Sequence, residues 1–482
     1  MMQLVLQKDA VLHTRNPMLY GHFLEHFHRQ IYGGVYDPSS PFADADGFRT
    51  DVIEALRNIK TPVIRWPGGC FVSAYHWKKG VGKNRVPYFD KAWRMEESNA
   101  FGTDEFIRLC EKIGCAPYIC TNAGTGDAEE MSDWVEYCNL KTEGEFARAR
   151  IQNGYEKPYN VKYWSIGNEN YGSWEMGAKE AHEWSRLVLE SAKMMKRADA
   201  DISLSAAALN NKSWNTTLLQ AAGQWLDWIS IHQYWDGLWR ENNPSDYETC
   251  MNFANNLTSQ IDSVRSLLTE MGLEKKIKIA FDEWNLRAWH HPNHDAPTSD
   301  KEKYLAPRDK NDLNSTYTMA DAVFSACFLN ALLRNADIVG MANFAPVVNT
   351  RGAIFTHKDG IVKRSTYYVF ELYANYMYDQ VIGFTCKDGG DSVDITATKD
   401  SQTGAVAIAA VNKHPADAVT IEIDGVLPGT CVIRTLNGES ADDYNDVGRD
   451  SVRIKTSNGT PASGGRLTAE LPPHSVTVIS FG

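Results

Sequence analysis

Short apolar runs alternate with longer amphipathic segments over residues 19–345, and this alternation constrains the fold more than any other feature of the chain. Near-continuous apolar character over a few residues is typical of parallel strands covered on both faces. The expected strands are Leu19–Glu25, Pro62–Trp66, Ala116–Thr121, Val161–Asn168, Ile202–Ala207, Trp228–Gln233, Ile277–Glu283 and Ile338–Ala345. Helical patterns lie between them, such as Asp51–Lys60, Asp104–Ile113, Lys179–Arg197, Asn252–Met271 and Tyr317–Arg334. Eight such repeats predict an α/β fold closed into a (β/α)₈ TIM barrel, in preference to an open doubly wound sheet.

The pattern of apolar residues changes after the last expected barrel helix, Thr366–Met377. Short alternating segments follow, separated by Gly, Asp, Pro and Asn, which is typical of a small antiparallel β-sandwich. The expected strands are Val393–Thr398, Ala405–Asn412, Val419–Ile423, Cys431–Thr435, Val452–Ile454 and Ser475–Ser480. We therefore predict a barrel domain at 16–377 and a C-terminal sandwich domain at 378–482, joined by an N-terminal strand within 1–15.

Composition narrows the function classes. The formal net charge of −12 argues against nucleic acid or an anionic membrane surface as the partner, since both select for basic patches. No run approaches the ~18 apolar residues of a membrane span, and the first residues have no signal-peptide pattern. The nine cysteines lack zinc-ligand spacing, so we read them as free thiols of a cytoplasmic protein.

Polar residues stand at the ends of five of the expected strands. The carboxyl ends of barrel strands share one rim, and this rim holds the active site of such enzymes. Any one of these residues could be a local ion pair or a cap, but their coincidence at one rim favours a functional site. They are Glu25, Arg65, Asn168, Glu169, His232, Tyr234 and Glu283.

Glu169 and Glu283 suggest glycoside hydrolysis, because that reaction uses two carboxyl groups across one bond. A nucleophilic carboxylate must be ionised, and Arg65 and Tyr234 are candidate donors to Glu283. The acid needs a raised pKa, which we expect for Glu169 from burial and from the charge of Glu283. A carboxyl separation of about 5 Å would mean retention of configuration, and about 6.5–9.5 Å inversion. Asn168 and Glu25 could then bind sugar hydroxyls.

Five longer words carry a family resemblance: Arg29-Gln-Ile-Tyr-Gly-Gly-Val-Tyr36, Arg65-Trp-Pro-Gly-Gly-Cys-Phe-Val-Ser73, Ile166-Gly-Asn-Glu169, Ile231-His-Gln-Tyr234 and Phe281-Asp-Glu-Trp-Asn285. Together they resemble glycoside hydrolase family 51, mostly exo-acting α-L-arabinofuranosidases. The resemblance implies a double displacement that releases terminal arabinofuranosyl residues from oligosaccharides. It implies no cofactor, and a homo-oligomer that is often a hexamer. By the resemblance Glu169 is the acid/base, Glu283 is the nucleophile, and the sugar subsite is lined by Glu25, Arg65, Cys70, Asn168, His232 and Tyr234, with Trp93 reaching in from a loop.

The chain departs from the family pattern in several places, and two of these departures bear on the sugar. Many members have Gln where an ungapped reading places Gly352, beside Arg351, and an aromatic residue where this chain has Arg287. We therefore expect Arg287 and Arg351 to shape the pocket, and the sugar stays open: β-xylosidase, galactofuranosidase or β-glucan-cleaving activity are the alternatives. A non-catalytic carbohydrate-binding barrel is disfavoured by the two glutamates. His290-His-Pro-Asn-His294 matches no common zinc spacing, so we expect no metal.

Overall fold

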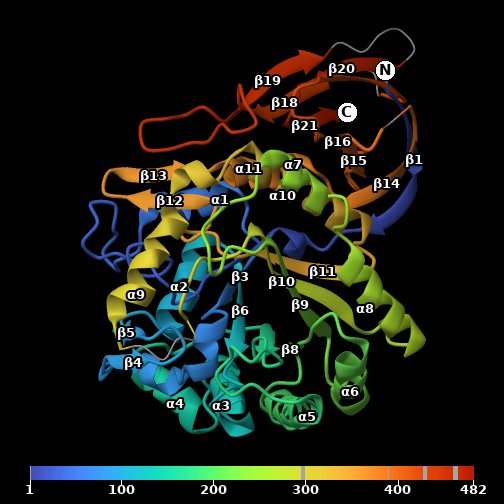
Figure 1. Ribbon diagram of the computed structural model, residues 1–482. Helices are drawn as coiled ribbons and strands as arrows, with labels where there is room; N and C mark the ends of the chain where they lie inside the picture. The colour runs from blue at the N-terminus through green and yellow to red at the C-terminus, as the bar shows by residue number, and fades with distance from the viewer. Residues whose placement is uncertain (1, 295–298, 389, 427–430, 460–464) are drawn as a thin grey trace.

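The computed structural model describes residues 2–294, 299–388, 390–426, 431–459 and 465–482. Eight parallel strands close into a barrel, with helices around it and a sheet along one side (Figure 1). The predicted TIM barrel is confirmed. Its strands are β2 (Gly21–Phe23), β3 (Val63–Trp66), β6 (Ala116–Thr121), β7 (Tyr163–Ile166), β8 (Ser203–Ala207), β9 (Trp228–Asp236), β10 (Lys278–Arg287) and β11 (Val339–Phe344).

The first barrel strand is shorter than expected. Leu19 and Tyr20 belong to a 3₁₀ turn, η1 (Pro17–Tyr20), because Pro17 starts that turn and the Asn16 side chain caps it through the Met18 amide. β2 therefore spans only Gly21–Phe23, and Glu25 lies two residues beyond its end. The side chain of Glu25 is consequently positioned by the loop.

The helices around the barrel follow the expected alternation, with one difference. The predicted helix Asn252–Met271 is two helices, because Asp246 caps an earlier start at the Thr249 amide and a turn separates the two. The helices are α1 (Thr50–Asn58), α2 (Thr103–Ile113), α3 (Ala128–Asn139), α4 (Glu145–Gln152), α5 (Ala181–Ala198), α6 (Lys212–Ala222), α7 (Tyr247–Phe253), α8 (Ser259–Glu270), α9 (Lys301–Leu305), α10 (Met319–Arg334) and α11 (Ser365–Tyr376).

The C-terminal part is one continuous nine-stranded sheet with the order β19-β18-β21-β16-β15-β14-β1-β17-β20. All pairs are antiparallel except β1 with β17, and β20 also contacts β16 and β21, so the sheet folds over into two layers. The expected sandwich is confirmed, although β14 and β20 were not predicted. The strands are β1 (Met2–Thr14), β14 (Gln380–Lys387), β15 (Val393–Lys399), β16 (Val406–Asn412), β17 (Val419–Asp424), β18 (Cys431–Asn437), β19 (Arg453–Gly459), β20 (Arg466–Leu471) and β21 (Ser475–Phe481).

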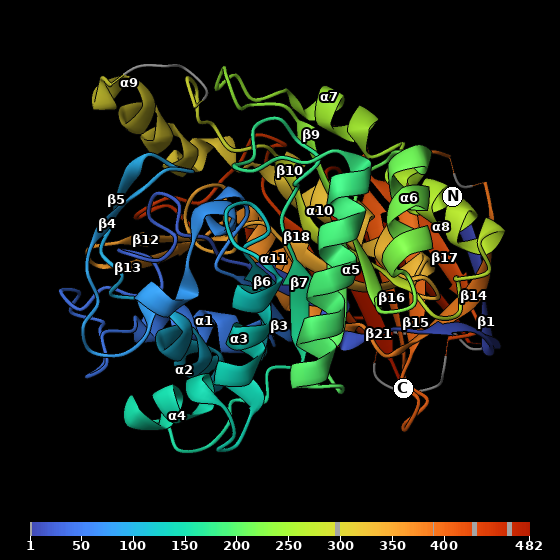
Figure 2. The same ribbon diagram turned by 90° about the horizontal axis from the view of Figure 1, so that it is seen from below.

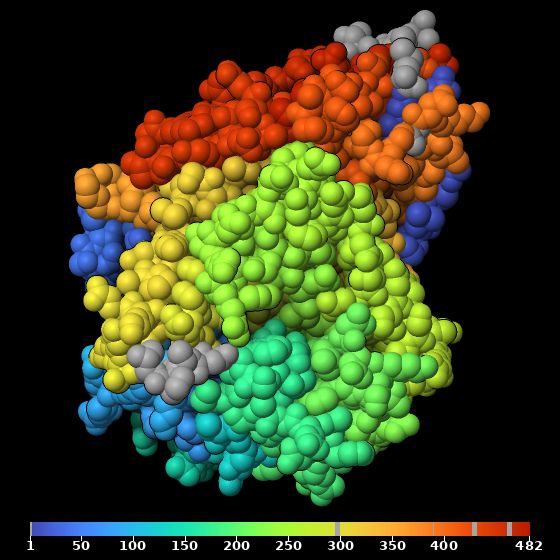
Figure 3. Space-filling view, viewed as in Figure 1, coloured from blue at the N-terminus to red at the C-terminus, as the bar shows by residue number. Residues whose placement is uncertain are grey.

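The sheet packs on the barrel through α10 and α11, which lie between the sheet and the barrel strands (Figures 1 and 2). α10 is buried on all sides because it contacts β10 of the barrel and β15, β16 and β21 of the sheet. Ile408 and Ala410 of β16 face the core between the two sheet layers, and Ala407 and Ala409 join the core shared with the barrel. Figure 3 shows the orange and red surface of the sheet against the yellow and green surface of the barrel. We propose the division at 377/378, between α11 and β14.

Two small hairpins complete the fold. β4 (Tyr88–Asp90) pairs with β5 (Met95–Glu97), and β12 (Ile354–His357) pairs with β13 (Gly360–Lys363). The turn between β4 and β5 contains Trp93, so this hairpin carries one of the predicted site residues.

Candidate active site

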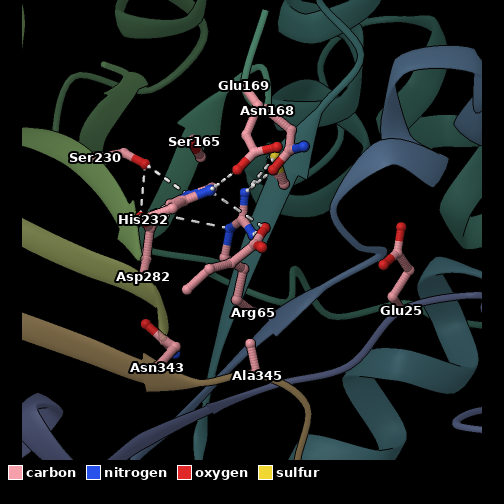
Figure 4. A network of polar contacts seen from close by, with 12 residues as sticks. Glu25, Arg65, Ser165, Asn168, Glu169, Ser230, His232, Asp282, Asn343 and Ala345 are labelled. Atoms are coloured by element: carbon pink, nitrogen blue, oxygen red, sulfur yellow. Dashed lines mark hydrogen bonds and ion pairs between the residues drawn. The ribbon is translucent and has the colours of Figure 1, made fainter. Parts of the chain in front are cut away.

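Six of the predicted residues meet at the carboxyl ends of the barrel strands. Figure 4 labels Arg65, Asn168, Glu169 and His232 among them. Glu169 and Glu283 each place one carboxylate oxygen, and His232 one ring nitrogen, within 4.8 Å of one another. Carboxylate oxygens this close favour the retaining arrangement, with carboxyl groups about 5 Å apart, over the inverting one at about 6.5–9.5 Å. The six residues are Arg65 from β3, Asn168 and Glu169 directly after β7, His232 and Tyr234 on β9, and Glu283 on β10.

Arg65 is the centre of the site. Its guanidinium is fully buried; Nη1 donates to Glu283 Oε1 at 2.6 Å and Nη2 donates to Asn168 Oδ1 at 2.8 Å. Its Nε lies 3.4 Å from Asp282 Oδ2. A guanidinium has a fixed set of donors and stays charged, so it orients these three side chains and favours the ionised carboxylates.

A bulge in β10 brings two consecutive carboxylates into the barrel. The register of β10 shifts against β9 between Ala280 and Glu283, whereas regular alternation would turn neighbouring side chains to opposite faces. Asp282 accepts hydrogen bonds from Tyr118 (2.7 Å) and Ser230 (2.6 Å), and Glu283 accepts one from Tyr234 (3.0 Å). Burial opposes ionisation of Asp282, but the charges of Arg65 and His232 lower its pKa to about 2.

Glu169 has a backbone conformation that non-glycine residues rarely adopt. Its φ is +42°, and Gly167, two residues earlier, also has a positive φ of +69°; a side chain on Gly167 would meet Asn170 and Trp184. The Asn170 side-chain oxygen accepts a hydrogen bond from the backbone amide of Asn168 at 3.0 Å, and this bond stabilises the turn. Such strain persists only where the surroundings enforce it, and it is concentrated at functional sites.

His232 and Glu169 form a charged pair, and this corrects the expected pKa of the acid. His232 Nδ1 lies 2.9 Å from Glu169 Oε1, and Nε2 lies 3.3 Å from Asp282 Oδ1. Burial lowers the pKa of His232, but Glu283, Asp282 and Glu169 together raise it to about 10. Burial also raises the pKa of Glu169, but His232, with Trp174 and Arg65, leaves it below the usual value. The proton that we expected on Glu169 therefore resides on His232.

Glu169, His232 and Glu283 are the one group in the described ranges with the spacing of a metal site. A metal needs the lone pair of a neutral imidazole. The raised pKa of His232 keeps both of its nitrogens protonated at neutral pH. The three side chains are therefore better suited to sharing a proton than to binding a metal ion. Of the predicted His-rich segment, His290 hydrogen-bonds the Leu238 carbonyl and His294 hydrogen-bonds the Ala92 carbonyl.

Glu25, Trp93 and Cys70 lie on the side of the site formed by the loops after β2 and β3. Glu25 Oε1 accepts from the Phe71 amide and from Trp93 Nε1, both at 2.8 Å. A side chain on Gly68 would approach Glu25 to 2.4 Å, so the Pro67-Gly-Gly69 turn leaves room for this carboxyl. Burial, above all, raises the pKa of Glu25 well above its usual value.

Arg287 and Arg351 lie in other networks. Arg287 pairs with Asp236 at 2.8 Å and Asp321 at 3.0 Å, which ties β10 to the start of α10. Arg351 donates to the Ala288 carbonyl and to Asn242. A side chain on Gly352 would lie 2.6 Å from the Asn349 carbonyl, so the turn after β11 does not accommodate a larger residue without shifting.

Asp282, Trp174 and Glu175 are among the residues that contact this site and were not predicted. Asp282 neighbours Glu283 in sequence, and its position beside the nucleophile was the available signal. Trp174 donates to Glu169 Oε2 at 2.8 Å and is 44% exposed, and Glu175 accepts from Asn168 at 3.0 Å. Both lie in the loop after β7, where irregular structure gives no periodic signal.

Comparisons with known proteins identify relatives along the whole chain. Two family models match, described as the α-L-arabinofuranosidase 1 domain at residues 55–252 and the α-L-arabinofuranosidase C-terminal domain at 282–475. A probable α-L-arabinofuranosidase C of Aspergillus clavatus is 32% identical over 97% of this chain and 94% of its own. An intracellular exo-α-(1→5)-L-arabinofuranosidase of Halalkalibacterium halodurans is 32% identical over 99% and 98%. The crystal structure of the α-L-arabinofuranosidase of Thermotoga maritima in complex with arabinose is 34% identical, with a TM-score of 0.89 over 100% and 99% of the two chains.

Proposed function

Because the chain belongs to the α-L-arabinofuranosidases of glycoside hydrolase family 51, we propose that it is a retaining exo-glycosidase that releases terminal non-reducing α-L-arabinofuranosyl residues from arabinose-containing oligosaccharides. The observation that carries the mechanism is the approach of Glu169, His232 and Glu283 to within 4.8 Å. The glycosidic bond is expected to lie between the two carboxyl groups.

In the first step Glu283 is the nucleophile. Arg65 and Tyr234 each donate to one of its oxygens, and these two hydrogen bonds direct the attacking carboxylate. Its attack on the anomeric carbon forms the glycosyl ester as the bond to the leaving oxygen breaks. The leaving oxygen takes a proton from Glu169.

The proton for that step comes from the pair of Glu169 and His232. The Nδ1 proton of His232 can move along the 2.9 Å hydrogen bond to Glu169 Oε1 as the leaving oxygen becomes basic. In the second step Glu169 is the base: a water loses its proton to Glu169 and attacks the anomeric carbon, which releases Glu283. Two cations, Arg65 and His232, face three carboxylates, and this excess of negative charge suits a positive transition state.

Asn168 and Glu25 are proposed to bind the sugar. The Asn168 amide nitrogen is beside the acid/base and can donate to the 2-hydroxyl, an interaction that strengthens as the oxocarbenium ion develops. Glu25 uses Oε1 for protein contacts, which leaves Oε2 for a sugar hydroxyl.

The experiment is a hydrolysis screen against four 4-nitrophenyl glycosides: α-L-arabinofuranoside, β-D-xyloside, β-D-galactofuranoside and β-D-glucoside. Dominant arabinofuranoside turnover is expected, and transfer to methanol should give methyl α-L-arabinofuranoside, which reports retention. Turnover of another sugar alone would overturn the substrate, and a methyl β-product would overturn the retaining mechanism.

We also propose a cytoplasmic homo-oligomer, with a hexamer as the form that the family suggests. The name of the Halalkalibacterium halodurans relative, which is called intracellular, supports the compartment. No helix in the described ranges is long and apolar enough to cross a membrane. Light scattering after size-exclusion chromatography tests the assembly, since a single species of 54.1 kDa would contradict an oligomer.

A further inference from the structure

Glu175 is a further carboxyl group of the site, and no step of the proposed reaction uses it. It lies in the loop after β7, six residues beyond Glu169, and is 4% exposed. Its Oε1 accepts from Asn168 Nδ2 at 3.0 Å, its Oε2 accepts from Ser73 at 2.6 Å, and the Cys70 thiol also donates to it. It therefore connects the turn that holds Asn168 and Glu169 to η2 (Cys70–Ala74).

Asn168 is clamped between Arg65 and Glu175, and the clamp determines which way its amide points. Arg65 has only donors, so the amide oxygen must face it, as the 2.8 Å contact indicates. The amide nitrogen must then face Glu175, which takes one of its two hydrogens. The second hydrogen remains for a ligand, and its direction is fixed by both partners.

The surroundings of Glu175 favour its neutral form. In the part of the chain that the structure describes, no Lys, Arg or His side chain pairs with it. Glu169 acts on it as a like charge, and Glu25, Cys70 and Tyr171 are the other titratable groups that interact with it. Burial, followed by the charge of Glu169, raises the pKa of Glu175 to about 8 despite the three hydrogen bonds. The hydroxyl of Ser73 can accept as well as donate, so it accommodates the extra proton.

We propose that Glu175 is a positioning residue which, as a neutral carboxylic acid, fixes the Asn168 amide so that its free N–H meets the 2-hydroxyl of the sugar. This rests on the proposed function, which it deepens. The role needs a hydrogen-bond acceptor at this position, so glutamine should replace Glu175 and an apolar residue should not.

The kinetic test compares kcat/KM on 4-nitrophenyl α-L-arabinofuranoside with that on its 2-deoxy analogue. Glu175→Gln should stay within about threefold of the wild type on both. Glu175→Leu should lose about 10-fold or more on the parent sugar, since a directed hydrogen bond to the transition state is lost, and about twofold or less on the 2-deoxy sugar. Adding Glu175→Leu to Asn168→Ala should cost nothing further. Equal losses on both sugars would overturn the proposal. If Glu175→Leu does not fold, Glu175→Ala gives the same comparison.

The protonation state is tested without substrate. Between pH 4.5 and pH 8 the unfolded chain releases the proton of Glu175 and the folded chain keeps it, so the wild type loses stability relative to Glu175→Gln as pH rises. The variant should melt at a higher temperature, with a gap that widens from pH 5 to pH 8. A gap that does not change with pH would overturn the neutral form. Wild-type inactivity on the arabinofuranoside would instead count against the proposed substrate. The comparison of a parent sugar with its 2-deoxy analogue would then use the glycoside that the enzyme does cleave.

Discussion

Arg65 shows how single residues set up this site. One guanidinium contacts Asp282, Glu283 and Asn168, so the nucleophile and its neighbouring amide share one buried donor. His232 has the matching role for Glu169 and Asp282. A buried carboxylate is costly unless it is paired, and here each of the three nearest carboxylates has a cation beside it.

Removal of the acid should affect substrates according to their leaving group. Glu169→Ala should lose about 10²–10⁴-fold in kcat/KM on an arabino-oligosaccharide, because a poor leaving oxygen needs the proton. A 2,4-dinitrophenyl arabinofuranoside needs little assistance, so bond cleavage in its first step should be nearly unaffected, as pre-steady-state release of the phenol would report. A uniform loss across good and poor leaving groups would contradict this role for Glu169.

The charge of Asp282 should determine up to which pH His232 stays protonated. Asp282 contributes to raising the pKa of His232 to about 10, so Asp282→Asn should lower it and move the alkaline limb of kcat/KM to lower pH. The measurement belongs in a Glu175→Gln background, where ionisation of Glu175 does not contribute. Ser230→Ala, which removes a hydrogen bond but no charge, is the control. An alkaline limb that stays in place would contradict the pairing.

At this scale the sequence predicts the residues that end strands and misses those that depend on local geometry. Arg65, Glu169, His232 and Glu283 were found because polar residues at the ends of buried strands share one rim. Asp282 was missed because regular alternation would point it away from Glu283, and the bulge in β10 is a tertiary feature. The predicted rise in the pKa of Glu169 was wrong, because the sequence around Glu169 does not reveal that a protonated His232 lies beside it.

Among the elements, β10 has two functions. Its centre carries Asp282 and Glu283, and its end carries Arg287, which ties the strand to α10 through Asp321. Arg287 is 2% exposed, and all three nitrogens of its guanidinium donate to Asp236, Asp321 or the Ser245 carbonyl. We therefore infer that Arg287 holds β10 against α10.

Arg287→Met should destabilise the protein more than it impairs binding. It leaves Asp236 and Asp321 buried without their cation, which typically costs about 3–5 kcal/mol. Chemical denaturation measures the loss, and Arg186→Met on the exposed face of α5, where Arg186 pairs with Glu190, is a matched control with an expected change below about 0.5 kcal/mol. A raised KM at unchanged stability would contradict this assignment and return Arg287 to the sugar pocket.

The barrel strands were predictable because they are continuous apolar runs. Other elements were missed because their apolar pattern is short or incomplete. β16 is buried on both faces and reads as Val406-Ala-Ile-Ala-Ala-Val-Asn412. β20 alternates exposed and buried residues over only Arg466–Leu471, and β14 ends in exposed residues, so neither gave a clear pattern. The break between α7 and α8 was missed because apolar spacing continues across it.

On the scale of the whole molecule, the two ends of the chain meet in one sheet. β1 lies between β14 and β17, so the C-terminal sheet is complete only when the first residues of the chain have joined it. The position of β1 inside a sheet built mainly from the last hundred residues also makes the folding of the two parts interdependent.

Leu4→Ala should therefore destabilise the protein although it lies far from the site in sequence. Leu4 is fully buried in the core between the two sheet layers, and such a truncation typically costs about 2–5 kcal/mol. Val5→Ala, next to it but 41% exposed, is the control with little expected change. The kcat of folded Leu4→Ala should equal that of the wild type. Equal melting temperatures for both variants would contradict a structural role for β1.

The central claim is that Glu283 forms the bond to the sugar, and azide rescue of Glu283→Ala tests it most directly. The variant should lose turnover of 4-nitrophenyl α-L-arabinofuranoside. Added azide should restore part of it by entering the space of the missing carboxylate and should give the inverted β-L-arabinofuranosyl azide, identified by nuclear magnetic resonance. Absence of rescue, or an azide product of retained configuration, would contradict the assignment of Glu283 as the nucleophile.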